Sequence, residues 1–230
     1  DALRTPIGKY GGSLSTMRPD DLLAMVIKTI LNKNPSIDIS AIEDVIAGAA
    51  NQSGEDNRNV GRMAALLAGL PVTVAGSTVN RLCASGLQAI MDASRAIMCG
   101  DGDLYIACGV ESMTRAPFVM PKTTTPFGRE PQIYDTTLGW RFTNKKLAEL
   151  YHPYTMGETA ENVAKQWNIS RHAQDKFAFD SQQKYFAAQA ENKFKETSIS
   201  AENYFLLSDA INYAKESVEI RLKHLEEKKE

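Results

Sequence analysis

Three short segments with the character of strands, separated by segments with helical periodicity, constrain the fold of this chain most strongly. They are DVIAGAA from Asp44 to Ala50, the run from Gly76 to Val79, and LYIACGV from Leu104 to Val110. The first and the third are short, apolar runs. Strands that are apolar on both faces and alternate with helices indicate a mostly parallel sheet covered on both sides. The sequence therefore predicts an α/β fold.

The helical segments between these strands have recognisable ends. Arg18-Pro19-Asp20-Asp21 opens the first helix, because proline suits the first turn and acidic side chains favour the positive end of the helix dipole. Asn34-Pro35 ends that helix, the run from Val60 to Leu70 forms the second, and Gly100 ends the third. One face of the third helix carries Leu87, Ile90, Met91, Ile97 and Met98.

The character of the chain changes near Ala116. Residues 117–141 contain several Pro, Thr and Gly residues and show little periodicity, which is typical of a functional loop or an inserted subdomain. Helical periodicity resumes at Thr159 and again after Ser170, which we expect to cap a long helix. Residues 201–230 are interpreted as a charged amphipathic helix. The predicted organisation is an α/β domain at 1–115, a second domain at 116–200 and a helical tail at 201–230.

Composition and charge argue against several classes of partner. The 230 residues are 43% apolar, enough for a sizeable core, and the net charge is −2 with lysine and arginine scattered along the chain. This pattern favours neither a nucleic acid nor a membrane as partner, and no uncharged apolar run approaches the ~18 residues of a membrane span. Three cysteines without a CxxC spacing suggest neither a disulfide framework nor a zinc site. These three cysteines, together with the lack of a leader segment, predict a reducing, cytoplasmic location.

The cysteine in STVNRLCASGLQAI, Cys83, lies where a predicted strand passes into a predicted helix. Free backbone N–H groups and the helix dipole at that position favour a thiolate over a thiol. Ser85-Gly86 keeps the turn small, so the sulfur can face the crevice at the carboxyl end of the strand, where open α/β sheets place ligands. A thiolate there can attack a thioester while its own N–H faces the oxyanion. Position alone also leaves open an inert, buried cysteine.

Several segments, taken in their order along the chain, resemble those of a known family. They are RTPIGKYGGSL (4–14), GEDNRNVGRMAALLAGLP (54–71), TVNRLCASGLQAI (78–90), GVESMTRAPFVMPK (109–122), IYDTTLGWRF (133–142) and MGETAENVAKQWNISRHAQDKFAFDSQQK (156–184). In this order the chain resembles the thiolases, the acyl-CoA:acetyl-CoA C-acyltransferases, over about residues 1–196. The segment IYDTTLGWRF resembles the degradative branch that contains β-ketoadipyl-CoA thiolase.

The resemblance implies half of a thiolase fold, built as βαβαβαββ with a mixed sheet, and a loop domain inserted after its fourth strand. It implies that Cys83 is the acylated nucleophile, that Met156 is a wall of the acyl pocket, and that the loop domain covers CoA. Acyl-CoA and CoA would be the substrates, with no metal or redox cofactor. Family members are dimers or tetramers, so a homodimer or homotetramer is expected, with residues 51–70 near the dimer interface.

The chain also departs from the family. In thiolases the second half of the chain supplies an activating histidine, a second cysteine that acts as acid and base, and an Asn–His pair for an oxyanion, and this sequence lacks the segments that carry them. We also expect an element before Asp1, because DALRTPIG reads as the end of a strand. Residues 201–230 do not fit the family, and Thr155 stands where some thiolases have histidine.

The other reactive side chains have structural interpretations. His152 is interpreted as a surface or CoA-proximal residue, because no glycine precedes its His-Pro pair. Cys99 lies at a helix end and Cys108 inside an apolar strand, so both are expected to be structural. The remaining residues are His172 and His224, expected at the surface, and Glu111 and Arg115, expected to shape the sheet edge or a subunit contact.

Two other functions stay open at this point. The missing groups favour a catalytically incomplete fragment, which at most binds CoA or a partner chain, as the alternative to an active acyl-CoA thiolase. The third possibility is a decarboxylating condensing enzyme of the same fold, and the match over residues 156–184 argues against it.

Overall fold

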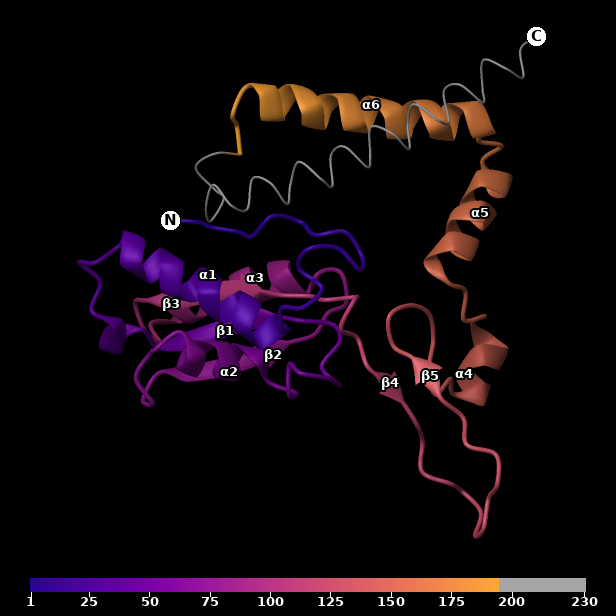
Figure 1. Ribbon diagram of the computed structural model, residues 1–230, viewed down its shortest axis with the longest axis horizontal. Helices are drawn as coiled ribbons and strands as arrows, with labels where there is room; N and C mark the ends of the chain where they lie inside the picture. Colours follow the sequence, from indigo (N-terminus) through magenta and orange to yellow (C-terminus); the bar gives the residue numbers. More distant parts are fainter. Residues whose placement is uncertain (195–230) are drawn as a thin grey trace. The chain divides into compact units, whose positions relative to one another are not determined.

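The computed structural model describes residues 1–194, which form two compact units (Figure 1). One unit consists of Asp1 with residues 14–144, and the other of residues 2–13 with residues 145–194. The domain boundaries at 115/116 and 200/201 stay predictions, and the helix expected over residues 201–230 lies outside the described residues. Within residues 1–194, no helix has both the length and the apolar character that crossing a bilayer requires.

The first unit is built on a three-stranded parallel sheet. Its strands are β1 (Asp44–Gly48), β2 (Ala75–Val79) and β3 (Tyr105–Gly109), in the order β2-β1-β3. The register places Gly48 opposite both Val79 and Gly109, so the three carboxyl ends lie at one edge of the sheet. The three predicted strands and the α/β class with a parallel sheet are confirmed.

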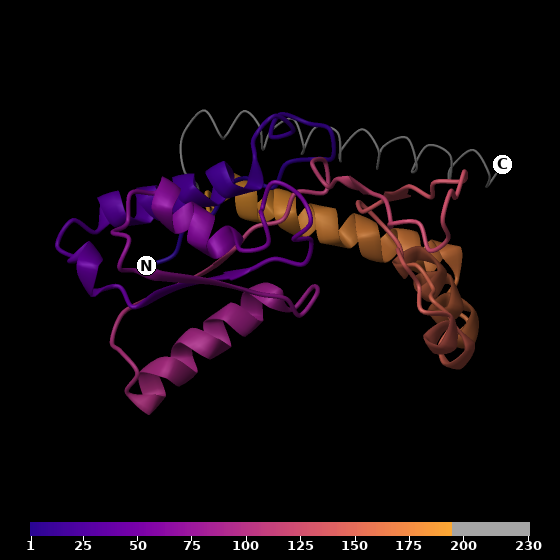
Figure 2. The same cartoon turned by 90° about the horizontal axis from the view of Figure 1, so that it is seen from below.

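One face of this sheet is covered by α1 (Pro19–Lys33) and α2 (Val60–Leu67), and a short 3₁₀ helix (Ile39–Ala41) precedes β1 (Figure 2). Val45 and Ala47 of β1 are fully buried on this face. The main core consists of these two residues with Leu23, Ala24, Ile27, Ile42, Ala49, Val60, Ala64, Ala65, Leu70 and Val74. Helix α2 ends before the predicted Leu70, because the chain turns at Gly69, which has a φ of 89°.

The other face is covered by α3 (Ser85–Cys99), which Figure 2 shows across the sheet from α1 and α2. Ile46 of β1 packs there against Ala89 and Ala93. The opposite side of α3 is apolar and exposed, with Leu87, Ile90, Ile97 and Met98 at 60%, 54%, 46% and 85% exposure. Gly100 ends the helix in the left-handed conformation, with φ of 78°, which confirms the predicted cap.

Residues 117–144 form a long excursion of the first unit with little regular structure, which agrees with the predicted loss of periodicity. Its two strands, β4 (Phe118–Val119) and β5 (Tyr134–Asp135), pair antiparallel over two residues. Thr136 is buried, and its N–H and hydroxyl both donate to the carbonyl of Pro117, at 3.2 and 2.6 Å. Such long-range hydrogen bonds fix the excursion, because it has few buried apolar side chains of its own.

The second unit contains α4 (Lys145–Leu150), α5 (Met156–Gln166) and α6 (Arg171–Ala190) among its described residues. Thr155 and Glu158 form a capping box, so α5 begins three residues before the predicted Thr159. The predicted cap of α6 is confirmed: the hydroxyl of Ser170 accepts a hydrogen bond from the N–H of Ala173 at 3.2 Å.

In the opening segment of the second unit, residues 2–13, Arg4 takes part in a β-bridge and no longer strand is described, so the strand end expected there stays a prediction. A strand is held by the neighbour with which it exchanges backbone hydrogen bonds, and neither described sheet includes this segment. Instead, the guanidinium carbon of Arg4 lies 5.3 Å from the ring centroid of Phe194, in a cation–π contact.

Candidate functional site

Cys83 lies in a tight turn between β2 and α3. Asn80 opens the turn: its Oδ1 accepts a hydrogen bond from the N–H of Leu82 at 3.0 Å, and its Nδ2 donates to the carbonyl of Ala50 at 2.9 Å. Leu82 has a φ of 51°, which is uncommon for a residue with a Cβ. This backbone path leaves Cys83 exposed at the carboxyl edge of the sheet, so its predicted position between strand and helix is confirmed.

The hydroxyl of Ser85 closes this turn from the inside. Ser85 is buried; its Oγ accepts a hydrogen bond from the N–H of Arg81 at 2.9 Å and donates to the carbonyl of Leu82 at 2.6 Å. Its backbone N–H donates to the same carbonyl at 3.0 Å. A single buried residue therefore fixes both ends of the turn that presents Cys83.

The start of α3 lies directly against the last residue of β1. A Cβ added to Gly48 would overlap the backbone of Ser85 and Gly86. Backbone atoms inside a helix cannot move aside as the end of a flexible side chain can, so this close approach requires glycine. The position of the cysteine turn above the sheet edge therefore depends on Gly48.

Two backbone N–H groups near the sulfur, those of Gly86 and Leu87 in the first turn of α3, make no hydrogen bond to residues 1–194. Unbonded N–H groups and the positive end of the helix dipole favour negative charge at this position, either on the sulfur or on an oxyanion beside it. Free N–H groups of the kind expected from the sequence are therefore present at the start of α3.

Cys83 lines an open cavity of about 530 Å³, within the size range of sites for small ligands. Loops that follow the three strands form most of its wall: Ala50-Asn51 after β1, the turn around Cys83 after β2, and residues 110–113 after β3. The excursion adds Thr136, Thr137 and Arg141. Most of the lining is apolar, so a ligand in this cavity would meet few polar groups.

Glu111 holds two of these loops together. Its carboxylate accepts hydrogen bonds from the N–H groups of Ala50, at 2.8 Å, and Asn51, at 3.2 Å. The side chain of Asn51 in turn donates to the hydroxyl of Thr136 at 3.1 Å, which links the excursion to the sheet edge. The expectation that Glu111 shapes the sheet edge agrees with these contacts.

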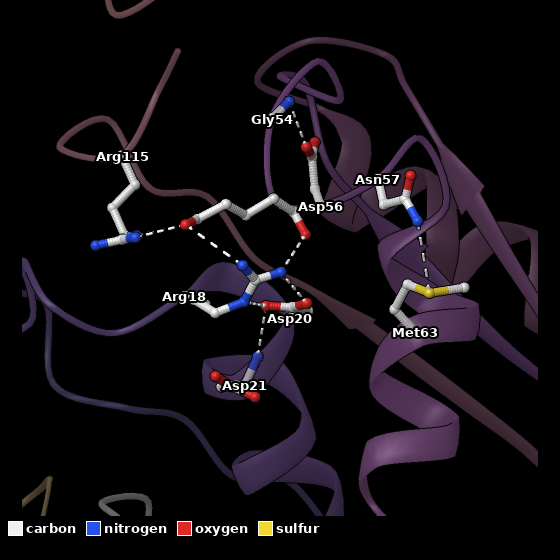
Figure 3. Close-up of polar contacts among 9 residues, drawn as sticks. Arg18, Asp20, Asp21, Gly54, Asp56, Asn57, Met63 and Arg115 are labelled. Atoms are coloured by element: carbon white, nitrogen blue, oxygen red, sulfur yellow. Dashed lines mark hydrogen bonds and ion pairs between the residues drawn. The ribbon is translucent and has the colours of Figure 1, made fainter.

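A second polar cluster joins the loop after β1 to the start of α1 (Figure 3). The guanidinium of Arg115 pairs with the carboxylate of Glu55, and Arg18 pairs with Asp20 through bonds of 3.0 and 2.8 Å. The hydrogen bond from Arg115 is the main reason that the pKa of Glu55 lies below its usual range. Arg115 also donates to the carbonyl of Ser15 at 3.1 Å, in agreement with its structural interpretation.

Asp56, beside this cluster, is buried and only partly paired. Its Oδ1 accepts a hydrogen bond from the N–H of Gly54 at 2.8 Å, and its Oδ2 has no hydrogen-bond partner among the described residues. Burial raises the pKa of Asp56, because the ionised carboxyl loses water that its neighbours only partly replace.

Replacing Asp56 with asparagine should raise the free energy of unfolding at neutral pH by about 1 kcal/mol, because the amide keeps an acceptor for Gly54 and has no charge to desolvate. Since the folded-state pKa lies above the ordinary 3.8, the contribution of Asp56 to wild-type stability falls as the pH rises from about 4 through that pKa, and the gain from Asp56→Asn grows over the same range. Urea unfolding across this pH range measures the effect, with the exposed Asp103→Asn as control. A less stable Asp56→Asn would contradict the prediction.

The other two cysteines lie elsewhere in the first unit. Cys108 is half-buried in β3, with its Sγ 3.6 Å from the carbonyl oxygen of Ile46, and burial, with a smaller effect of Asp44, raises the pKa of its thiol to about 12. Cys99 is the exposed last residue of α3 and does not line the cavity. Both positions agree with structural roles.

Iodoacetamide at about pH 8 should alkylate Cys83 first, Cys99 second and Cys108 last. With a pKa of about 12, Cys108 is roughly 0.01% thiolate at that pH, about a thousandfold less than an ordinary thiol. Cys83 should lead because it lies beside the unbonded N–H groups of the first turn of α3. Peptide mass spectrometry over time measures the three rates, and equal rates at Cys83 and Cys99 would argue against an activated Cys83.

Met156 and two of the histidines belong to the second unit. Met156 is the exposed first residue of α5, and its place in an acyl pocket stays a prediction. His152 is exposed beside the ring of Tyr154, with centroids 4.3 Å apart, and His172 is exposed in the first turn of α6, as expected. His224 lies outside the described residues. Residues 1–194 contain no group of three or more His, Cys, Asp or Glu side chains that could hold a metal ion.

Two residues of the site were missed by sequence reasoning. The sequence indicated only that Ser85 keeps the turn small, and it did not predict the two hydrogen bonds that the Ser85 hydroxyl makes. Arg141 was not considered, although it lines the cavity. The available signal was its place in IYDTTLGWRF, the segment that distinguishes one branch of the family, where it is one of two charged residues.

Comparisons with known proteins point to one family. Residues 1–204 match the family model described as "Thiolase, N-terminal domain". A β-ketoadipyl-CoA thiolase from Escherichia coli is 58% identical over 190 residues, which are 83% of this chain and 47% of that protein. An Acinetobacter baylyi protein of the same name is 57% identical over 84% of this chain and 48% of its own. The acetyl-CoA acetyltransferase of Cupriavidus necator is 41% identical over 85% and 48%.

The chain spans about half the length of the curated relatives that it matches. The match to the family model, however, covers most of the chain and includes Cys83, both sheet faces and the cavity wall. This chain therefore belongs to the thiolase family.

Proposed function

We propose that this chain acts in acyl transfer between CoA thioesters, with Cys83 as the residue that carries the acyl group. The observation that carries the proposal is the exposed Cys83 at the start of α3, next to unbonded N–H groups and open to a cavity of about 530 Å³. Relatives named β-ketoadipyl-CoA thiolase, and one named 3-oxoadipyl-CoA/3-oxo-5,6-dehydrosuberyl-CoA thiolase, support a 3-oxoacyl-CoA and CoA as substrates.

In the degradative direction, the Cys83 sulfur attacks the 3-oxo carbon of the substrate. The resulting oxyanion would be stabilised by N–H groups at the start of α3. The bond between the second and third carbons then breaks, its electron pair stays on the second carbon, and a proton completes acetyl-CoA. The thiol of CoA attacks the acyl-Cys83 carbonyl, and the shortened acyl-CoA leaves as the sulfur is freed.

The finer features of the family fold are part of the same proposal. They are the βαβαβαββ half with its loop domain at residues 116–200, the cover that this domain forms over CoA, and the acyl-pocket wall at Met156. A homodimer or homotetramer, a cytoplasmic location and chemistry without a metal or redox cofactor are proposed with them. The resemblance of the motifs supports these points.

The second candidate is a chain that accepts an acyl group but does not complete turnover. It concerns these 230 residues by themselves, which contain no histidine or second-cysteine segment of the family. Without an acid to protonate acetyl-CoA, the step that breaks the carbon–carbon bond has no proton donor at hand.

The test separates acylation from turnover. The full chain is incubated with succinyl-CoA or acetyl-CoA, and intact-mass and peptide mass spectrometry locate the acyl group, which hydroxylamine should release from a thioester. We expect the adduct on Cys83, and thiolysis of 3-oxoadipyl-CoA near background. Rapid thiolysis would overturn the second candidate, and no adduct on Cys83 would overturn the proposed function.

A further inference from the structure

We propose that Arg141 recognises the terminal carboxylate of a dicarboxylic acyl chain held on Cys83. The inference rests on the proposed function, since it names the residue that selects the acyl group at the same site. Three arguments support this proposal: the charge of the cavity wall, the contacts that hold the excursion in place, and the length of the acyl chain.

Arg141 supplies the only positive charge among the described residues that line the Cys83 cavity. Two charged residues line this cavity, Glu111 and Arg141. The carboxylate of Glu111 already accepts hydrogen bonds from Ala50 and Asn51. Arg141 is half-buried, and its guanidinium has no hydrogen-bond or ion-pair partner among residues 1–194. A half-buried cation on a mostly apolar wall favours an anionic ligand.

The backbone around Arg141 is fixed at several points, so its place on the cavity wall is determined by the fold. Thr137 donates to the carboxylate of Asp135 through its N–H, at 2.8 Å, and to the carbonyl of Met113 through its hydroxyl, at 3.3 Å. Beyond a turn at Gly139, the ring of Phe142 packs edge-on against Tyr134 with centroids 5.1 Å apart. These contacts hold both ends of the segment that contains Arg141.

The length of the acyl group matches the cavity. Cleavage of a six-carbon 3-oxo dicarboxylic thioester leaves a four-carbon acyl group on Cys83, whose free carboxylate lies about 5 Å from the sulfur when extended. A carboxylate–guanidinium pair adds about 4 Å. A sphere of about 530 Å³ is about 10 Å across. Cys83 and Arg141 on the wall of one such cavity can therefore hold this acyl group between them.

A second anion of the substrate, the phosphate of CoA, could also pair with an arginine. The pantetheine arm places the nearest phosphate about 15 Å from the thioester sulfur when extended, further than the cavity is wide. The acyl carboxylate is therefore the anion that fits this wall, and the experiment separates the two sources.

The experiment measures how charge at the end of a short chain changes its rate of attachment to Cys83 in the full chain. The reagents are methanethiosulfonates with 2-carboxyethyl, propyl or 2-aminoethyl groups, which differ in charge at similar length. The Cys83 thiolate attacks the divalent sulfur, a disulfide forms and methanesulfinate leaves with the bonding electron pair. Rates at Cys99, measured in the same digest, correct for the reactivity of each reagent.

We expect the carboxyethyl reagent to modify Cys83 about tenfold faster than the propyl reagent after this correction, and the aminoethyl reagent to be slower. The Arg141→Gln variant should lose the preference, Arg141→Lys should keep part of it, and Arg129→Gln, an exposed arginine of the same excursion outside the cavity wall, should keep all of it. A preference that survives in Arg141→Gln would overturn the proposal.

The two anion sources are distinguished by protection. Succinate should slow carboxyethyl modification of Cys83 in the wild type more than in Arg141→Gln, whereas CoA without an acyl group should protect both equally. Protection by CoA that depends on Arg141, with none by succinate, would assign the arginine to the phosphate and overturn the proposal. Because these rates require no acylation by a thioester, the inference can fail while the proposed function stands, and the reverse.

Discussion

Alanine in place of Gly48 will lower the free energy of unfolding of the first unit by about 3 kcal/mol or unfold it, because its Cβ would overlap the backbone of Ser85 and Gly86. To relieve the overlap, α3 must move away from the sheet and loosen the packing of Ile46 against Ala89. Urea unfolding followed by circular dichroism measures the loss. The rate of alkylation at Cys83 should fall with it, since the turn before α3 moves.

A matched control for Gly48→Ala is available in α3, three elements along the chain. A Cβ added to Gly86 meets no atom within 4 Å, so Gly86→Ala should be neutral or slightly stabilising in its helix. Equal losses of stability in the two variants would show that the tight contact at Gly48 is not what positions α3.

Serine in place of Cys83 will reduce acylation by acyl-CoA at least about a thousandfold, because a serine hydroxyl is not ionised at neutral pH without a base beside it. Intact-mass spectrometry after incubation with succinyl-CoA measures the adduct. Cys99→Ser is the matched control and should acylate at the wild-type rate, since Cys99 does not line the cavity.

A loss of stability should not account for this result, because Cys83 is exposed. The melting temperatures of Cys83→Ser and the wild type should therefore agree. An undiminished adduct in Cys83→Ser, located on another residue, would remove Cys83 from the mechanism.

The sequence was a good guide where structure is decided by neighbouring residues. Pro19 and Gly100 mark helix ends through the backbone angles that they allow, and Ser170 does so through its own hydroxyl, so these boundaries could be predicted locally. The position of Cys83 followed from the same reasoning, because a strand that ends before a helix places the intervening residue at the sheet edge.

The sequence was a poor guide where structure depends on distant residues. Arg141 lies on the cavity wall because Thr136 and Thr137 donate hydrogen bonds to the carbonyls of Pro117 and Met113. No local sequence pattern predicts such pairs. The strand end expected at the start of the chain depends on a distant partner in the same way, because local residues do not specify the neighbour with which an extended peptide pairs.

The bare outer side of α3 has a practical consequence for anyone who handles this chain. Exposed leucine, isoleucine and methionine side chains bind other apolar surfaces, so the protein will tend to aggregate at high concentration, most of all in ammonium sulfate. Lysine at position 98, the most exposed of these residues, should raise the concentration at which the solution stays clear without disturbing the buried side of the helix, which Ala89 and Ala93 form.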